Sequence, residues 1–350
     1  MLRQNWWKAL AVILLAYTII AGMLMPLKPG IVRAEPSSAR AGTELQLEVQ
    51  GYNTRFTAGG AALRAWLKAE DGSAISATAI RTLDDKRLSL KFSLPLYLPV
   101  EAQVKDMALL LDDPVNGAIV LPSAVFITQA AADVEKGRAL WGGAQIAGLH
   151  EVPGFHYPFR NILKETIRNT YFHVPLWFAM LFLFLYSMLS SIRYLRHQDE
   201  DADARAKALT STGILFGLLG LVTGAIWAKN TWGAYWSWDV KQNMTVIALL
   251  IYMAYFILRG AFEDQDKSAR LGAVYNIFAF GALVPLIYVV PRLTDSLHPG
   301  AGGNPAFGSE DLDNTMRMVF YPAILGWTLL GFWIASLAYR AERLQRISAF

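Results

Sequence analysis

Three tryptophans stand within seven residues in the stretch 232–243, WGAYWSWDVKQN, which lies between two long apolar runs. A single interfacial tryptophan usually belongs to the aromatic belt of a membrane protein. Three of them, beside a glycine that allows close approach, form a flat apolar surface suited to a planar aromatic ligand such as a porphyrin. We therefore predict that Trp232, Gly233, Trp236 and Trp238 bind such a ligand. If the stretch is helical, Trp232 and Trp236 share one face, flanked by Tyr235 and Trp238.

Two histidines stand beside prolines at the ends of other apolar runs: His173 in YFHVP and His298 in SLHPG. A lone histidine at a membrane interface usually places only a polar ring among the headgroups. Two neutral imidazoles on the side where the tryptophans emerge are what a six-coordinate haem iron accepts. We therefore predict His173 and His298 as axial ligands of a haem iron, with each proline stiffening the backbone beside its ligand. His150 and His156, earlier in the chain, could substitute for them.

Asp239 ends the tryptophan stretch and has a plain structural explanation. An Asp followed three residues later by Gln242 is a plausible capping box at the start of a helix. A carboxylate next to a porphyrin would repel its propionates, so we expect Asp239 to orient the loop or to bond to a tryptophan indole. Basic residues of the outer face are the candidates for propionate contacts, although each could equally contact lipid headgroups. They are Lys229, Lys241, Arg292 and Arg317.

The elements that must position these residues are membrane helices. Apolar residues make up 54% of the chain and charged residues 17%. A helix needs about 20 apolar residues to cross the hydrocarbon core. Six stretches without Asp, Glu, Lys or Arg come close to or exceed that length: 9–27, 169–192, 208–228, 242–258, 271–291 and 318–339. The predicted fold class is a mainly α polytopic membrane protein with six transmembrane helices.

The distribution of Lys and Arg predicts the orientation, because basic loops stay on the cytoplasmic side. Basic residues collect before the first span, between the second and third, between the fourth and fifth, and after the sixth. Both termini are therefore predicted to be cytoplasmic, and the segments 28–168, 229–241 and 291–317 to face outward. The sequence Val32-Arg33-Ala34 resembles a cleavage site, but the preceding run is long for a signal peptide and favours an uncleaved anchor. The acidic run 199–203 is expected to be a solvated turn.

An exported β-domain is predicted between the first two spans. Residues 28–132 alternate between apolar and polar types, and turn signals separate the runs, which is typical of an immunoglobulin-like β-sandwich. The stretch FRNILKETIRNTYFHVP has apolar residues near helical spacing and favours an interfacial helix. The chain has no cysteine and hence no disulfide. We expect four parts: an anchor helix at 1–27, the β-domain at 28–132, an interfacial segment at 133–168 and a five-helix domain at 169–350.

The motifs resemble those of a known family. WGAYWSWD fits the WGxxWxWD signature (WWD motif) of the cytochrome c assembly proteins that handle haem, CcmC, CcmF and CcsA, and YFHVP and LHPG stand where that family has two flanking external histidines. The resemblance covers spans two to six and is greatest to the CcmC branch, haem exporter protein C. It implies a protein of the bacterial inner membrane that presents haem b on the outer face. His173 and His298 would be its axial ligands and residues 232–239 its platform.

The resemblance also implies partners: a CcmE-like haem chaperone, CcmA- and CcmB-like transporter subunits, apocytochrome c indirectly, and membrane lipid, with no nucleic acid. It implies haem transfer rather than catalysis, and the main alternative is a component of a CcsA-type cytochrome c synthase. A small-solute transporter is disfavoured because the predicted spans contain no charged residue. Two departures from the family are the large β-domain and the sequence QNMT, which replaces the usual Thr-Ser stretch after the signature.

Overall fold

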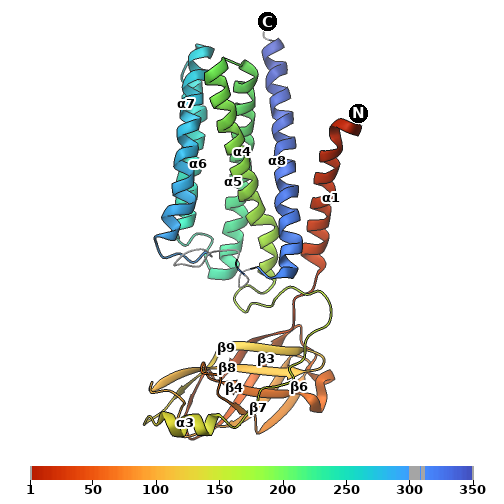
Figure 1. Cartoon of the computed structure of the whole chain (residues 1–350), viewed down its shortest axis with the longest axis vertical. Helices are drawn as coiled ribbons and strands as arrows, with labels where there is room; N and C mark the ends of the chain where they lie inside the picture. The colour runs from red at the N-terminus through yellow and green to blue at the C-terminus, as the bar shows by residue number, and fades with distance from the viewer. Residues whose placement is uncertain (1, 299–307, 309–311, 349–350) are drawn as a thin grey trace. The chain divides into compact units, whose positions relative to one another are not determined.

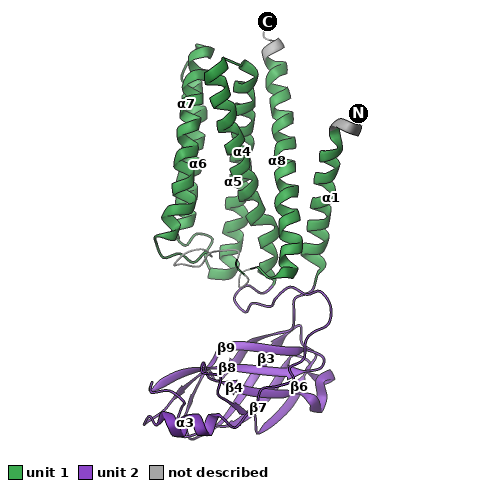
Figure 2. Cartoon of the chain, in the orientation of Figure 1, with its two compact units in different colours: residues 1–25, 165–350 green, residues 26–164 purple. Residues whose placement is uncertain are grey.

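The chain forms two compact units, which we describe separately (Figures 1 and 2). The computed structural model describes residues 2–298, 308 and 312–348. The helical unit comprises Met1–Met25 and Glu165–Phe350, and the β unit is Pro26–Lys164. The predicted fold class, a polytopic helical protein with an inserted β-domain, is confirmed.

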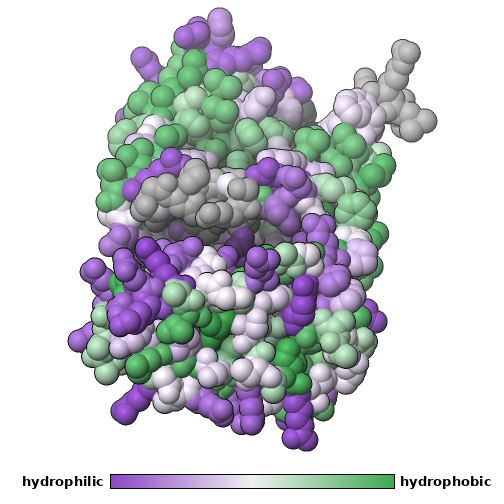
Figure 3. Space-filling model, turned by 60° about the horizontal axis from the view of Figure 1, so that its bottom comes forward, coloured by the Kyte–Doolittle hydropathy of each residue, from purple (hydrophilic) through white to green (hydrophobic). Residues whose placement is uncertain are grey.

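Six helices in the described part of the chain are long and apolar enough to cross a membrane, as predicted. They are α1 (Leu2–Leu24), α4 (Thr170–His197), α5 (Glu200–Trp232), α6 (Val240–Gly260), α7 (Gln265–Val284) and α8 (Asn314–Ser348). A π-helical turn, Pro285–Val289, and a 3-10 turn, Val290–Arg292, continue α7. The space-filling view shows apolar residues covering much of the visible flank of the helices (Figure 3), as a lipid-facing surface requires.

A stripe of glycines on α5 lets α4 pack closely against it. The stripe consists of Gly213, Gly217, Gly220 and Gly224. Facing these glycines in the same order are Phe184, Met180, Trp177 and His173 of α4. A Cβ atom placed on any of the four glycines would lie within 3.0 Å of the facing side chain, so each large side chain occupies space that only glycine leaves open. This interlocking places His173 against α5 at the end of the stripe.

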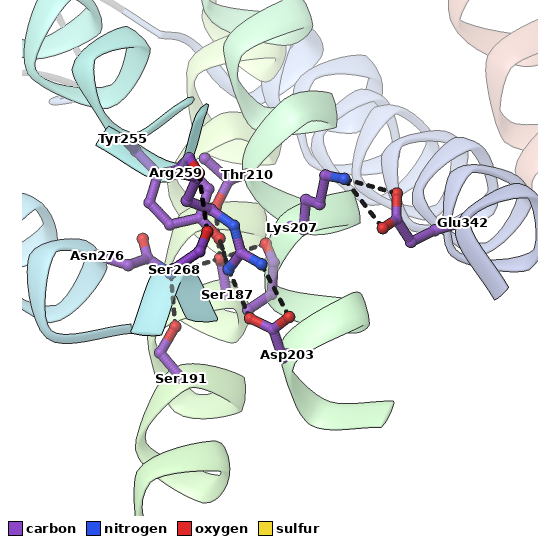
Figure 4. Close-up of polar contacts among 11 residues, drawn as sticks. Ser187, Ser191, Asp203, Lys207, Thr210, Tyr255, Arg259, Ser268, Asn276 and Glu342 are labelled. Carbon is purple, nitrogen blue, oxygen red and sulfur yellow. Dashed lines mark hydrogen bonds and ion pairs between the residues drawn. The ribbon is translucent and has the colours of Figure 1, made fainter. Parts of the chain in front are cut away.

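A buried ion pair ties α5 to α6 at the opposite end of the helical unit (Figure 4). Arg259 donates from both terminal nitrogens to the two carboxylate oxygens of Asp203, and the two side chains are only 12% and 4% exposed. The Tyr255 hydroxyl accepts a further bond from Arg259 at 3.2 Å. The prediction of a solvated acidic turn at 199–203 is therefore wrong. The run begins α5 instead: Asp199 caps the helix through two backbone N–H groups, and Asp203 lies inside the bundle.

A buried amide links α7 to α4 beside this pair (Figure 4). Asn276 Nδ2 donates to Ser187 Oγ at 2.7 Å and to Ser191 Oγ at 2.9 Å. Ser187 Oγ also lies 2.7 Å from Thr210 Oγ1 of α5. Buried polar groups without partners are costly in a membrane, so this chain of bonds fixes how the three helices are rotated against one another.

The β unit is a sandwich of two sheets. One sheet has the order β1 (Gly30–Glu35), β3 (Glu44–Tyr52), β7 (Arg87–Ser93), β6 (Ala79–Asp84). The other has the order β2 (Ser38–Arg40), β9 (Gly117–Thr128), β8 (Val104–Asp113), β4 (Arg64–Lys68), β5 (Ala74–Ser76). The pair β2 and β9 is parallel and the other pairs are antiparallel. The predicted alternation holds in β3 and β7, where Leu47 pairs with Leu90 and both are buried. A short helix, α2 (Phe56–Gly59), and a 3-10 turn, Gly60–Ala62, join β3 to β4.

The segment after the sandwich returns along the β unit to the helices. Helix α3 (Val134–Trp141) ends on Trp141, whose buried indole donates to the Tyr97 carbonyl at 3.1 Å. Where the sequence predicts an interfacial helix, the structure has one six-residue 3-10 helix, Lys164–Asn169, which leads directly into α4. Lys164 begins this element with a positive φ of 47°, so the chain turns sharply there.

The first helix packs against α8 at the edge of the helical unit (Figure 1). Gly326 of α8 leaves room for Leu14 and Leu15 of α1. Arg168 Nη1 donates to the carbonyls of Gly22 and Met25 at 2.9 and 2.7 Å, which ties the end of α1 to the start of α4.

Candidate functional site

The tryptophan stretch is a loop rather than a helix. Helix α5 ends at Trp232, and Gly233 adopts the left-handed conformation, with φ of 86°, that typically terminates a helix. Lys229 Nζ donates to the Gly233 carbonyl at 2.9 Å and completes this end. The predicted common face of Trp232 and Trp236 is therefore wrong. Gly233 makes the turn, and among the described residues no neighbouring atom lies within 4 Å of its virtual Cβ.

The tryptophans consequently fall into two groups. Trp232 lies against His298, with ring centroids 4.8 Å apart. Trp236 and Trp238 form a separate perpendicular pair 6.4 Å apart, and Trp238 is 79% exposed. The loop therefore offers one aromatic ring to the histidine and, separately, the pair of Trp236 and Trp238, of which Trp238 is exposed.

Trp227 lies between the two predicted histidines, and the sequence prediction missed it. Its ring centroid is 6.2 Å from His173 and 6.5 Å from His298, and it is 5.5 Å from Trp232. Its indole N–H donates to Thr166 Oγ1 at 3.2 Å, so the ring is fixed from behind. The signal that could have found it is its spacing, because Trp227 follows Gly224 by three residues and continues the glycine stripe of α5.

His173 is held in one tautomer. A tryptophan indole only donates, so the 3.2 Å bond from Trp177 Nε1 makes His173 Nε2 an acceptor. The ring proton is then on Nδ1, which donates to Thr223 Oγ1 at 3.1 Å, while the Thr223 hydroxyl donates to the Leu219 carbonyl. Gly224 makes room for the ring, because a Cβ there would lie 2.7 Å from His173 Cε1.

His298 is held by Asp239. Its Nδ1 lies 2.8 Å from Asp239 Oδ1, and the two side chains are 17% and 2% exposed. Asp239 also accepts from the Leu297 N–H at 2.8 Å and from the Ser296 hydroxyl. Burial by itself would raise the pKa of Asp239, but these hydrogen bonds and His298 outweigh it and lower the pKa. Burial lowers the pKa of His298, and Asp239 opposes this only in part, so the imidazole is neutral at pH 7.

Asp239 is also the predicted helix cap. It accepts from the Lys241 N–H at 2.9 Å at the start of α6. The reciprocal half of the capping box differs from the prediction, because Gln242 Oε1 accepts from Ser237 N–H at 3.0 Å instead of from Asp239. Asp239 therefore holds the start of α6, and the same carboxylate also orients the ring of His298.

The four predicted propionate contacts lie in different surroundings. Lys241 is within electrostatic range of both Asp239 and Arg292, close to His298. Arg292 is exposed at the end of the 3-10 turn. Lys229 is occupied with the end of α5, and Arg317, at the start of α8, contacts Asn314. Parts of the segment 291–317 lie outside the described residues.

The alternative histidines belong to the β unit. His150 Nδ1 lies 2.8 Å from the buried Asp112, and its backbone N–H donates to the same carboxylate at 2.7 Å. His156 Nδ1 is buried and has no hydrogen-bond partner within the described part of the chain.

The end of the helical unit that carries the tryptophan loop can therefore present two neutral imidazoles, each with its proton on Nδ1 and a lone pair on Nε2. Two such imidazoles suit a metal ion whose other ligands do not come from the protein. Among the described residues, no group of three or more His, Asp or Glu side chains is placed to hold a metal ion.

The part of the chain that contains this site is similar to known proteins. The family model described as CcmC, Heme exporter protein C, matches residues 150–349, which contain both histidines and the tryptophan loop. The chain is 30% identical over 207 residues to Heme exporter protein C of Paracoccus denitrificans, covering 58% of this chain and 84% of that protein. It is 29% identical over 182 residues to the Bradyrhizobium diazoefficiens protein of the same name, covering 52% and 68%. The corresponding figures for the Escherichia coli protein are 24% over 183 residues, 52% and 71%.

Proposed function

This chain belongs to the CcmC family, heme exporter protein C, and from that premise we propose that it holds haem between His173 and His298 at the outer face of a bacterial inner membrane. It is a multi-pass membrane protein, and its family handles haem during cytochrome c maturation. The haem is cargo, taken as haem b, and its iron would accept the two imidazoles as axial ligands.

The observation that carries this proposal is the bond between His298 Nδ1 and Asp239. Metal-ligating histidines commonly donate their other ring N–H to a carboxylate, which fixes the tautomer and strengthens the ligand. His173 shows the same tautomer through Thr223. Both rings therefore direct a lone pair through Nε2, as a bis-histidine site needs.

The surrounding side chains fit a flat apolar cargo with two carboxylates. Trp227 and Trp232 supply aromatic surface against the histidines. Lys241 and Arg292 are the best placed of the four bases for the propionates, because Lys241 is within electrostatic range of Asp239 and His298, and Arg292 is within range of Lys241. Arg and Lys near a carboxylate-bearing ligand provide charge-assisted hydrogen bonds.

We propose that the cargo passes to an exported acceptor, a CcmE-like haem chaperone, with CcmA- and CcmB-like transporter subunits as further partners. Apart from Asp239, which holds His298, the residues around the two histidines are aromatic, hydroxyl-bearing or basic, which suits holding and release of a ligand better than bond formation. A role inside a cytochrome c synthase is the second candidate. Helices α4 to α8 and the loops between them carry all the proposed ligand contacts, so the β unit is proposed to serve another part of the process outside the membrane.

Absorption spectroscopy of the detergent-purified, haem-loaded protein tests the proposal. The parent should show the spectrum of a six-coordinate bis-histidine haem, oxidised and reduced. His173→Ala and His298→Ala should each lose the six-coordinate spectrum. His197→Ala, at the other end of α4, is the matched control and should keep it. The proposal is wrong if the parent binds no haem, or if both site variants give the parent spectrum.

A further inference from the structure

We propose that the two histidine positions are unequal. His298 is the anchoring ligand, and His173 is the exchangeable one because Trp177 competes for its Nε2. The inference rests on the proposed function, since it concerns the same two histidines. It assigns Trp177 a positioning role, acting on the cargo through His173.

The competing bond is built into α4. Trp177 follows His173 by one helical turn, and its indole N–H points at Nε2 over 3.2 Å. The two rings are perpendicular, with centroids 5.8 Å apart. Gly220 keeps the indole in place, because a Cβ there would lie 2.7 Å from the Trp177 ring. An iron can reach the Nε2 lone pair of His173 only after this hydrogen bond is given up.

His298 has no such competitor within the described part of the chain, where the hydrogen bonds of its ring are made through Nδ1. Its Nδ1 faces a carboxylate, whereas His173 has neutral partners, the Thr223 hydroxyl at Nδ1 and the backbone of Gly220. A carboxylate partner increases the basicity of the ligating nitrogen more than a neutral hydroxyl does, and losing such a partner typically costs about 10- to 100-fold in metal affinity. Both differences make the bond from His298 the stronger one.

This asymmetry suits a carrier that must both hold and release its cargo. When the iron leaves His173, the Trp177 N–H re-forms its bond to Nε2 and stabilises the released ring. Since one neutral hydrogen bond contributes modestly in net terms, the released form gains roughly 2- to 10-fold in population. His298 keeps the cargo attached during the exchange.

Trp177→Phe tests the competition directly, because Phe keeps an aromatic ring over Gly220 and lacks the N–H. The reduced, haem-loaded protein is mixed with carbon monoxide at low concentration, where the observed rate follows the fraction of protein with the exchangeable histidine released. We expect this rate to fall roughly 2- to 10-fold in the variant. The matched control is Trp327→Phe on α8, whose indole donates to the Tyr171 carbonyl and not to a histidine; it should keep the parent rate.

A second pair of variants identifies which histidine leaves. His173→Ala should retain five-coordinate haem that returns to the six-coordinate spectrum with added imidazole, whereas His298→Ala should bind haem at least tenfold more weakly. Asp239→Asn should raise the carbon monoxide rate above that of the parent if carboxylate support is lost. A parent without a bis-histidine spectrum overturns the proposed function. A bis-histidine parent with an unchanged rate in Trp177→Phe, or with equal losses in the two alanine variants, overturns only the inequality.

Discussion

The carboxylate of Asp239 joins the first turn of α6 to the ring of His298. It accepts from the first turn of α6 at Lys241 and from the ring of His298, and the Leu297 N–H and Ser296 hydroxyl hold it from the other side. Any movement of the cap therefore moves the histidine. The motif that looks like a helix start in the sequence is, in the fold, the support of a proposed iron ligand.

The position of His173 depends on the space that Gly224 leaves open for its ring. Adding one methyl group in Gly224→Ala would bring it 2.7 Å from His173 Cε1 and force the ring to move. We expect the variant to lose six-coordinate haem and to unfold with a free energy lower by about 1–3 kcal/mol, the usual range for overpacking. Absorption spectra and denaturant titration of the same preparation measure the two effects.

Gly281→Ala on α7 is the matched control, because no atom lies within 4 Å of its virtual Cβ. Removing a helical glycine there should leave the spectrum unchanged and raise helix stability by at most about 1 kcal/mol. If Gly224→Ala behaves like Gly281→Ala, then His173 is not packed against α5 as described.

Helices α4, α5, α6 and α7 are fixed against one another by two different devices. Glycines interlock with large side chains along α4 and α5, and buried polar bonds join α5 to α6 and α7 to α4 at the other end. Because the proposed ligands come from α4 and from the loop after α7, both devices contribute to holding them in register.

Breaking the Asp203–Arg259 pair should destabilise the helical unit strongly. Arg259→Leu leaves a carboxylate that is 4% exposed without its cation, and uncompensated buried charges cost about 3–5 kcal/mol. Arg193→Leu removes a comparable pair with Asp199, but Arg193 is 60% exposed, so a loss of at most about 1 kcal/mol is expected. Unfolding titrations in one detergent compare the two. Equal losses would mean that the Asp203 pair is solvated.

The elements themselves could largely be predicted from the sequence, because long apolar runs and period-two alternation carry their own signal. The exceptions depend on distant partners. Asp203 reads as part of a polar turn and is buried only because Arg259 of another helix neutralises it. The spacing of Trp232 and Trp236 fits one face of a helix, but Gly233, in the left-handed conformation, ends the helix between them. The place of Trp227 in the site could not be predicted, because the histidines beside it, His173 and His298, come from two other parts of the chain.

At the scale of the whole molecule, the family match begins at residue 150 and so leaves out most of the β unit. That unit has its own buried charge cluster. The carboxylate of Asp112 is fully buried, accepts from the guanidinium of Arg64 and receives two bonds from His150. The cluster fastens the returning segment to the sandwich, because Arg64 also donates to the carbonyls of Ala147 and Gly148.

This cluster predicts acid sensitivity of the β unit. Burial would raise the pKa of Asp112, but the bonds from His150 and Arg64 outweigh it and lower the pKa below 3.8. A carboxyl with a lowered folded pKa stabilises the fold above its unfolded pKa, and this contribution is lost as pH falls through the folded value. We therefore expect proteolysis of the segment 142–150 to increase steeply below about pH 4. Asp112→Asn should be cleaved faster at pH 7 and show a weaker acid step, and an unchanged pH profile would contradict the assignment.

Near-infrared magnetic circular dichroism of the ferric, haem-loaded protein tests the central claim most directly, because the band position reports the pair of axial ligands. The account predicts the band of a bis-imidazole iron in the parent and in His197→Ala, and its loss in both His173→Ala and His298→Ala. A parent band for any other ligand pair, or a bis-imidazole band that survives in either site variant, would contradict it.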